Sequence, residues 1–181
     1  MKFLYGRNFE TRYIAISEII PENTSVTEVC AGDGYLYEYY LKKKNIKYIG
    51  LDVNPVFVNA ARKKNISFFL HDLMMDDVPS ADYVIIHASL YQFIPNEHVI
   101  IKKLLNAAAT TLIISEPVRN LSDSTNPVIA AFAKYSANPG NAHAVKRFNK
   151  ETLIACFKQY PEFKKVKAIK GGRELIGIFT K

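Results

Sequence analysis

From Val26 to Ser115, short apolar runs alternate with helix-like segments, and this alternation constrains the fold more than any other feature. The strand-like runs are Val26–Ala31, Ile46–Asp52, Ile66–Leu70, Tyr83–His87 and Thr111–Ser115, and the helical patterns are Tyr35–Lys44, Pro55–Lys64 and Glu97–Ala108. Runs of this length suit buried strands, and the segments between them have the apolar spacing of amphipathic helices. Strands that alternate with helices predict an α/β protein with a parallel sheet covered on both faces.

Both ends of the chain modify this plan. An apolar stripe over Asn8–Ile20, stopped by Pro21, predicts a helix before the first strand. Near the other end, Lys164–Lys170 and Arg173–Lys181 have strand patterns, and only Gly171-Gly172 separates them, which is a tight-hairpin signal. A hairpin makes its two strands antiparallel. We therefore expect a Rossmann-like, doubly wound, mostly parallel seven-stranded sheet with a C-terminal antiparallel hairpin strand.

Composition limits the class of protein. The 181 residues suffice for one sizeable core, so we expect a single domain over residues 1–181. No stretch approaches the ~20 apolar residues of a membrane span, and the N-terminus lacks the apolar core of a signal peptide. The two cysteines, Cys30 and Cys156, form neither a disulfide framework nor a metal site. These features predict a cytoplasmic protein without a metal.

The segment after the first strand is the first candidate binding element. In a doubly wound sheet, ligands bind outside the carboxyl ends of the strands, where the chain order reverses. Here Glu28-Val29-Cys30-Ala31-Gly32-Asp33-Gly34-Tyr35 forms a small-residue turn that feeds a helix. Small residues let a ligand lie against the backbone, and a helix N-terminus offers free N–H groups. Because glycine turns are also common as purely structural features, the turn alone does not decide the function.

Two aspartates add a nucleoside-like spacing. Asp52 ends the second strand 20 residues after Gly32, the separation at which an acid meets the ribose hydroxyls of a bound nucleoside. Asp72 follows the third strand after another 20 residues, although a solvated loop residue or a helix cap is the alternative. A nicotinamide dehydrogenase would share the turn and the first acid, but Tyr37 occupies its third glycine position. The pattern therefore favours a nucleoside site of another kind.

On these residues the chain resembles the class I S-adenosylmethionine-dependent methyltransferases, from about Val26 to Arg119, and the C-terminal hairpin agrees with that family. The resemblance implies that Asp52 binds the ribose diol and that Asp72-Leu73 contacts adenine. The cofactor-binding residues that it implies are Glu28, Cys30, Ala31, Gly32, Asp33, Gly34, Tyr35, Asp52, Val53, Asp72, Leu73, His87 and Ala88. The cofactor is then S-adenosylmethionine.

Cys30 departs from that family, which usually has glycine at this position. Cysteine is small enough for close approach to the methionine part of the cofactor, but it lacks the φ freedom of glycine. A redox-sensitive thiol is an alternative role, although a cysteine at a strand end is usually a buried small hydrophobe.

The acceptor side has weaker signals. Methyl transfer from a sulfonium requires in-line placement of a nucleophile, and a base only if the nucleophile carries a proton. The catalytic candidates are His87, Tyr91, Glu116 and His143, with Ser89, Arg119, Tyr135 and Arg147 as further polar residues near the mouth. His87 is the preferred base, because imidazole titrates near neutral pH.

The segment Pro117–Asn149 is too long for an ordinary connection, and Asn126-Pro127 marks a helix start within it. We expect this segment to form the acceptor side of the pocket, partly as a mobile lid.

The net charge of +7 raises the question of nucleic acid. The runs Lys42–Lys44, Lys63-Lys64 and Lys102-Lys103 fall on helices that lead away from the predicted mouth. The family resemblance implies an Asp/Asn-Pro-Pro-aromatic run after the fourth strand for an amino-methylating nucleic-acid enzyme, and a Pro-Cys nucleophile for a cytosine C5 enzyme. The chain has neither motif. A small-molecule acceptor is therefore favoured. The alternatives are an RNA or protein methyltransferase that docks through Lys164, Lys165, Lys167 and Lys170, or a non-catalytic S-adenosylmethionine-binding subunit.

Overall fold

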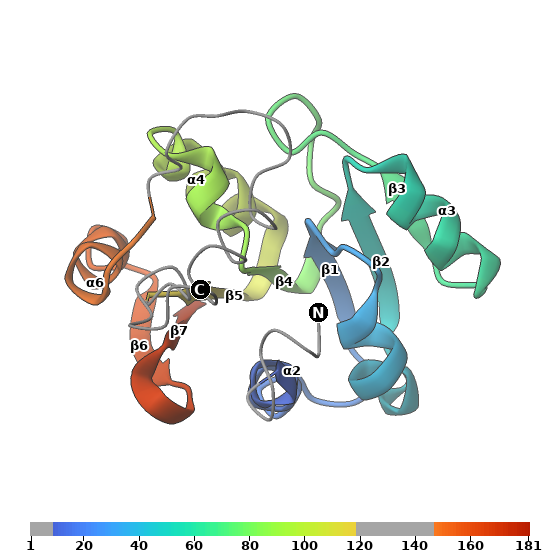
Figure 1. Cartoon of the computed structure of the whole chain (residues 1–181), viewed down its shortest axis with the longest axis horizontal. Helices are drawn as coiled ribbons and strands as arrows, with labels where there is room; N and C mark the ends of the chain where they lie inside the picture. Colours follow the sequence, from blue (N-terminus) through green and yellow to red (C-terminus); the bar gives the residue numbers. More distant parts are fainter. Residues whose placement is uncertain (1–8, 119–146) are drawn as a thin grey trace, which may run out of the picture.

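A computed structural model describes residues 9–118 and 147–181 of the chain (Figure 1). Its helices are α2 (Phe9–Ser17), α3 (Pro55–Lys63), α4 (Glu97–Ala107) and α6 (Lys150–Phe157), with short helical turns η2 (Tyr37–Leu41), η3 (Lys42–Lys44), η4 (Leu90–Phe93) and η6 (Lys170–Gly172). Its strands are β1 (Ser25–Val29), β2 (Lys47–Asp52), β3 (Phe68–Leu70), β4 (Ala81–His87), β5 (Ala108–Pro117), β6 (Phe163–Ala168) and β7 (Glu174–Thr180).

The strands form one seven-stranded sheet in the order β3-β2-β1-β4-β5-β7-β6. The pairs among the first five strands are parallel, and β7 runs antiparallel to both of its neighbours. This arrangement confirms the predicted mixed sheet with one reversed strand. The chain order reverses between β1 and β4, so the carboxyl ends of these two strands mark the switch point at which doubly wound sheets bind ligands.

The hairpin connection is longer than a two-residue turn. β6 ends at Ala168 and β7 begins at Glu174, and the amide of Ile169 still donates to the carbonyl of Glu174 at 2.9 Å. Gly171 and Gly172 lie inside this loop with φ values of +83° and +62°. The glycines supply the positive φ that the turn requires, but the loop around them is wider than the dipeptide alone predicts.

Helices cover both faces of the sheet (Figure 1). Ile16 of α2 and Val58 of α3 pack with Ile85 on one face, and Ile100 of α4 and Phe157 of α6 pack on the opposite face. Burial of side chains of this size stabilises the fold by roughly 1.5–3 kcal/mol each. In the described part of the chain, no helix is both long enough and apolar enough to cross a membrane.

A buried ion pair holds α2 against the carboxyl edge of the sheet. The Arg12 guanidinium of α2 pairs with both carboxylate oxygens of Glu174 at the start of β7, with 2.7 Å between Nη2 and Oε2. The hydroxyl of Ser115 on β5 donates to the same carboxylate. Two-pronged arginine–carboxylate pairs fix geometry as well as adding energy. The contact places α2 beside the end of β5 and the start of β7.

The segment predicted as one helix over Tyr35–Lys44 is irregular. It contains the π-helical turn η2 and the 3-10 turn η3, and it ends at Asn45 with φ +53°. Tyr37 stacks on Tyr48 of β2 with 4.3 Å between ring centroids, and Leu41 is fully buried. Both large side chains face the sheet, and the π-helical turn that carries them is wider than a turn of an α-helix.

Candidate functional site

The turn after β1 has an unusual backbone at the switch point. Cys30, Gly32 and Gly34 have φ values of +52°, +58° and +73°. A Cβ added at Gly32 would meet nothing within 4 Å, whereas one added at Gly34 would lie 3.2 Å from Phe68. Gly34 therefore lets the turn pack against β3, and the backbone at Gly32 faces open space that a ligand can enter.

Cys30 adopts the left-handed conformation that the resemblance assigns to glycine. The φ of +52° at a non-glycine residue costs about 1–2 kcal/mol. Burial raises the pKa of the Cys30 thiol to about 12, and the neighbouring carboxylates of Asp52 and Glu116 act in the same direction. A thiol with this pKa remains protonated near neutral pH, so the geometry supports a small packing residue and not a reactive thiolate.

Asp52 links the turn after β1 to the end of β2. Its Oδ2 accepts the amide of Gly32 at 2.8 Å, and its Oδ1 accepts the amide of Asn54 at 2.8 Å. Each carboxylate oxygen can accept a second hydrogen bond, so this carboxylate can hold the loop and still bind a diol. The next residue, Val53, is 67% exposed and offers an apolar surface beside the acid.

Asp72 closes a local turn after β3. Its Oδ1 accepts the amide of Met74 at 2.9 Å, and its own amide donates to Asp76 at 2.8 Å. The following residue, Leu73, is buried. These contacts match the alternative in which Asp72 is a loop residue, and the adenine contact of Asp72-Leu73 stays a prediction.

The turn after β4 is the second half of the switch point. Ala88 has a φ of +51°, and its amide donates to the carbonyl of Ser115 at 2.7 Å. Beneath the turn, Oε1 of Glu116 accepts the amides of Ser89 and Leu90 at 2.7 and 2.6 Å. Strained non-glycine backbone thus follows both strands that flank the switch point, as is common at functional sites.

Glu116 is fully buried. Burial raises the pKa of its carboxyl to about 7, against the lowering effect of the two amides. Its second oxygen, Oε2, has no hydrogen-bond partner among the described residues. The carboxylate therefore lies under the turn after β4, and its predicted catalytic role stays a prediction.

His87 is held by a buried carboxylate. Its Nε2 lies 2.8 Å from Oε1 of Glu28, and the hydroxyl of Tyr48 donates to Oε2 of Glu28 at 2.6 Å. The ring of Tyr13 on α2 packs edge-on against the imidazole at 5.4 Å. Nδ1 of His87 is buried without a hydrogen-bond partner in the part of the chain that the structure describes. The network orients the imidazole at the end of β4.

Glu28 uses both carboxylate oxygens inside the protein and is fully buried. Glu28 holds His87 from the core side, and its predicted contact with the cofactor stays a prediction. Asp33 is exposed, and it accepts the amide of Tyr35 at 3.2 Å. The ring of Tyr35 lies 4.8 Å from that of Tyr13, so the start of the helical segment adjoins α2.

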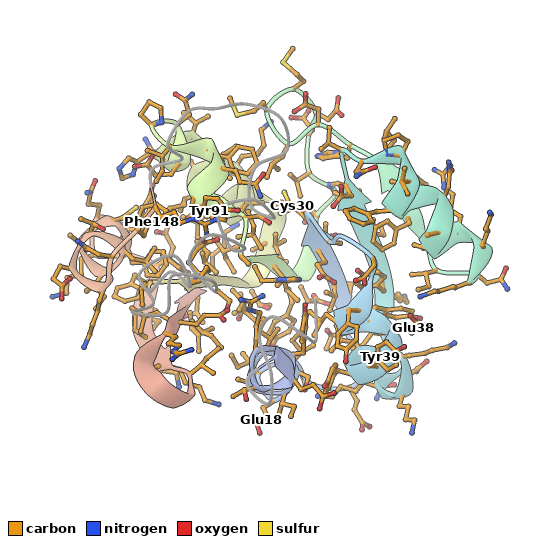
Figure 2. All side chains as sticks on the ribbon, in the orientation of Figure 1. Glu18, Cys30, Glu38, Tyr39, Tyr91 and Phe148 are labelled. Atoms are coloured by element: carbon orange, nitrogen blue, oxygen red, sulfur yellow. The ribbon has the colours of Figure 1, made fainter. Side chains whose placement is uncertain are left out.

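Tyr91 and Arg147 meet at the η4 turn. The guanidinium carbon of Arg147 lies 4.2 Å from the centroid of the Tyr91 ring, a cation–π arrangement. Phe148 is buried in the core on the same face of the sheet, and Figure 2 shows Tyr91 between Phe148 and Cys30 in this view. The end of the predicted acceptor segment therefore returns to the turn after β4.

Most of the remaining acceptor-side predictions concern residues that the structure does not describe. Arg119, Tyr135, His143, the Asn126-Pro127 helix start and most of the expected lid over Pro117–Asn149 lie outside the described residues.

Two lysines of the runs that were predicted to lead away from the mouth have structural contacts. Lys44 donates to the carbonyls of Ser17 and Ile20 after α2. Lys103 donates to the carbonyls of Leu73 and Asp76 at 3.0 and 2.9 Å. Lys103 thus supports the turn after β3 near the predicted adenine contact, which sequence reasoning missed because the contact joins residues far apart in the chain.

A separate hollow of about 480 Å³ lies between α4 and the loop after α6. Among its lining residues, His98 and Tyr160 are joined by a hydrogen bond of 2.8 Å. None of the predicted site residues lines it, so we do not assign the cofactor there. Within residues 9–118 and 147–181, no group of three histidine, cysteine or acidic side chains is placed to hold a metal ion.

Comparisons with known proteins agree with this fold. A family model described as methionine biosynthesis protein MetW matches residues 10–120. No curated protein matches the chain. Among solved structures, a chain from the complex between the Haloferax volcanii Trm112 methyltransferase activator and a methyltransferase is similar. Its TM-score is 0.73 at 15% identity, and the match covers 99% of this chain and 92% of that chain.

Two further structures are similar. The plantazolicin methyltransferase BamL has a TM-score of 0.72 at 16% identity, covering 99% of this chain and 88% of its own. The magnesium protoporphyrin IX methyltransferase ChlM from Synechocystis PCC 6803 has a TM-score of 0.69 at 15% identity, covering 99% of this chain and 92% of its own. At these identities the likeness establishes the fold, which is the Rossmann-like fold that the resemblance implied.

Proposed function

The chain belongs to the family of the methionine biosynthesis protein MetW, and from this premise and the site geometry we propose that it binds S-adenosylmethionine and transfers its methyl group to a small-molecule acceptor. The observation that carries the proposal is the 2.8 Å hydrogen bond from the Gly32 amide to Asp52 at the switch point. It places an open glycine beside an acid at the position where doubly wound sheets hold a nucleoside.

The residues at the mouth fit this cofactor. The remaining lone pairs of Asp52 accept the ribose hydroxyls, the exposed side chain of Val53 packs against the adenine, and the open space at Gly32 accommodates the methionine part. When bound, the cofactor supplies an activated methyl group on a sulfonium.

His87 supplies the proton-accepting group of the proposal. In the tautomer of this proposal, Nε2–H of His87 donates a hydrogen bond to the carboxylate of Glu28, and the lone pair is on Nδ1. Tyr13 restricts rotation of the ring by packing against its edge. For an acceptor whose nucleophile carries a proton, Nδ1 then acts as the base at the end of β4.

A second candidate, a non-catalytic cofactor-binding subunit, is favoured by a specific observation. Glu116 is fully buried under the turn after β4, and Nδ1 of His87 is also buried, without a hydrogen-bond partner among the described residues. Such a protein would bind S-adenosylmethionine without turnover. The RNA or protein methyltransferase alternative has less support, because the exposed lysines Lys164, Lys165 and Lys167 lie on β6, at the far end of the strand order from the switch point.

Calorimetry with three ligands tests the proposal. S-adenosylmethionine and S-adenosylhomocysteine should bind with dissociation constants in the micromolar range, and NAD should not bind comparably. The reverse preference would contradict the cofactor assignment. Formation of S-adenosylhomocysteine with a panel of small-molecule acceptors then supports transfer, whereas binding without turnover across small molecules, RNA and proteins supports the non-catalytic candidate.

A further inference from the structure

The two edges of the sheet differ in their protection. The β6 edge exposes Lys164, Lys165 and Lys167, and its pairing with β7 has a register irregularity between Phe163 and Lys165. Charged side chains and bulges are the usual devices that keep an edge strand from pairing with another chain. The β3 edge, Phe68–Leu70, contains no charged residue.

The β3 edge exposes large apolar side chains instead. Phe69 is 49% exposed, Leu70 60%, Met74 44% and Met75 80%. We refer to these four residues as the β3 edge patch, which lies at the end of the sheet opposite β6 (Figure 1). Single exposed apolar residues are ordinary, but two on an open edge strand and two in the loop that follows it mark an interaction site. Methionine side chains adapt readily to different partners.

A displaceable side chain occupies the open backbone edge of β3. The amide of Gly50 donates to the carbonyl of Ser67 at 2.9 Å, so the next carbonyl, that of Phe68, points away from β2. Nε of Arg62 on α3 donates to the Phe68 carbonyl at 2.8 Å, and its guanidinium carbon lies 5.9 Å from the centroid of the Phe69 ring. Arg62 therefore fills the position where the N–H of an added strand would bind.

We propose that the β3 edge patch binds an extended segment of another protein, which pairs with β3 and displaces Arg62 from the Phe68 carbonyl. Strand addition of this kind takes affinity from backbone hydrogen bonds and specificity from alternate side chains. The exposed acids Asp72, Asp76 and Asp77 follow directly after the strand. The exposed Lys63 and Lys64 precede the strand. Charge complementarity therefore requires a segment with alternating apolar residues and with lysine or arginine only at the end that lies beside the acids.

A second copy of this chain fits the patch less well. β3 has only three residues, so symmetric pairing of two β3 strands would be shorter than the ~5–6 residues of an ordinary strand. The other edge offers the lysines of β6 in place of an apolar face. A longer segment from a different protein can extend past Leu70 along the patch.

Selection of phage-displayed random twelve-residue peptides on the full chain tests the proposal. The enriched peptides should alternate apolar residues and carry lysine or arginine at one end. Their affinity, measured by fluorescence anisotropy, should fall about tenfold or more for Leu70→Lys, since a lysine would be buried against the apolar segment. Ala168→Lys, which adds the same charge to the β6 edge, is the matched control and should leave the affinity unchanged. Arg62→Ala should strengthen binding.

Three results would overturn the proposal. The first is that no peptides are enriched on the wild type relative to the Leu70→Lys protein. The second is that the enriched peptides bind Leu70→Lys as tightly as they bind the wild type. The third is that peptides methylated on alternate backbone nitrogens bind as tightly as the unmethylated peptides. Sedimentation that shows self-association abolished by Leu70→Lys would also overturn it, because the occupant would then be a second copy. Unchanged circular dichroism and S-adenosylhomocysteine affinity verify that Leu70→Lys is folded.

Discussion

Two carboxylates hold the two turns of the switch point, and they do so differently. Asp52 at the end of β2 accepts one backbone N–H on each oxygen, whereas Glu116 near the end of β5 accepts two on a single oxygen. Asp52 retains a little exposure beside the open backbone of Gly32, and Glu116 is fully buried. An acid at the end of a strand can therefore serve a ligand and a loop together, or a loop alone.

The difference lies in what surrounds the unused lone pairs. Those of Asp52 belong to a carboxylate that is hydrogen-bonded to Gly32, where an added Cβ would meet nothing within 4 Å. Those on Oε2 of Glu116 lie in the core, with no partner among the residues that the structure describes. We therefore propose that Asp52 binds the cofactor, whereas Glu116 stabilises the turn after β4. The following predictions test this division.

Glu116 should give the largest effect, and on stability. Burial raises its pKa from 4.5 to about 7, so the folded protein binds this proton more tightly than the unfolded chain. The free energy of unfolding should then fall as the pH rises from 4.5 through 7, by about 3 kcal/mol in total. Glu116→Gln should remove most of this dependence, because the amide does not ionise. Denaturant unfolding of both proteins between pH 5 and pH 8 measures the difference, and parallel curves would show that Glu116 does not titrate in this way.

Asp52 should give the next effect, and on binding. Charged hydrogen bonds contribute roughly 1.5–3 kcal/mol, so Asp52→Ala should weaken S-adenosylhomocysteine binding about tenfold or more. Glu116→Gln should stay within about threefold of the wild type.

Loss of the loop contacts alone would also weaken binding, so a second ligand separates the two causes. The wild type should prefer 5′-methylthioadenosine over its 2′-deoxy analogue, and Asp52→Ala should lose that preference. An unchanged preference in the folded variant would refute the ribose contact. Glu22→Ala, at an exposed position away from the site, is the control.

Cys30 should give a smaller effect that depends on backbone conformation. Glycine accepts the φ of +52° without strain, but it loses more conformational entropy on folding, which offsets much of that gain. Cys30→Gly should therefore keep cofactor affinity within about threefold and change stability by about 1 kcal/mol or less. Cys30→Val should lose more than about 1 kcal/mol, because a β-branched side chain is strongly disfavoured at positive φ. Thermal unfolding and calorimetry measure both variants. Large loss of binding in Cys30→Gly would show that the thiol itself contributes.

The contact between Arg147 and Tyr91 should give the smallest effect. A partly exposed cation–π pair contributes about 0.5–1 kcal/mol. A double-mutant cycle of Arg147→Ala and Tyr91→Leu should show coupling of that size in unfolding experiments, with cofactor affinity within about threefold. Additive effects of the two substitutions would mean that the rings and the guanidinium do not interact in solution.

Local patterns predicted the sheet and one half of the site. The apolar runs, the antiparallel hairpin and the 20-residue spacing from Gly32 to Asp52 are readable along the chain, and the structure places the last pair in a hydrogen bond. Helix α6 was readable but not predicted. Its capping box joins Asn149 and Thr152 in both directions, a signal that spans four neighbouring residues.

Long-range contacts determine the rest. Glu28 meets His87 only because β1 pairs with β4, 59 residues later in the chain. The burial of Glu116 depends on the same sheet and on the helices that cover it. The positive φ of Cys30 and Ala88 has no composition signal, since neither residue type favours that conformation. Such features follow from packing, which a pattern along one chain does not encode.

The central claim is that the turns after β1 and β4 form the cofactor mouth. Backbone amide chemical shifts recorded during titration with S-adenosylhomocysteine test it most directly. We predict saturable shifts at Gly32 and Ala88, which lie in these two turns, and at Val53 after β2, with the hollow around His98 and Tyr160 unaffected. Shifts concentrated at that hollow, with Gly32 and Ala88 unchanged at saturation, would contradict the assignment.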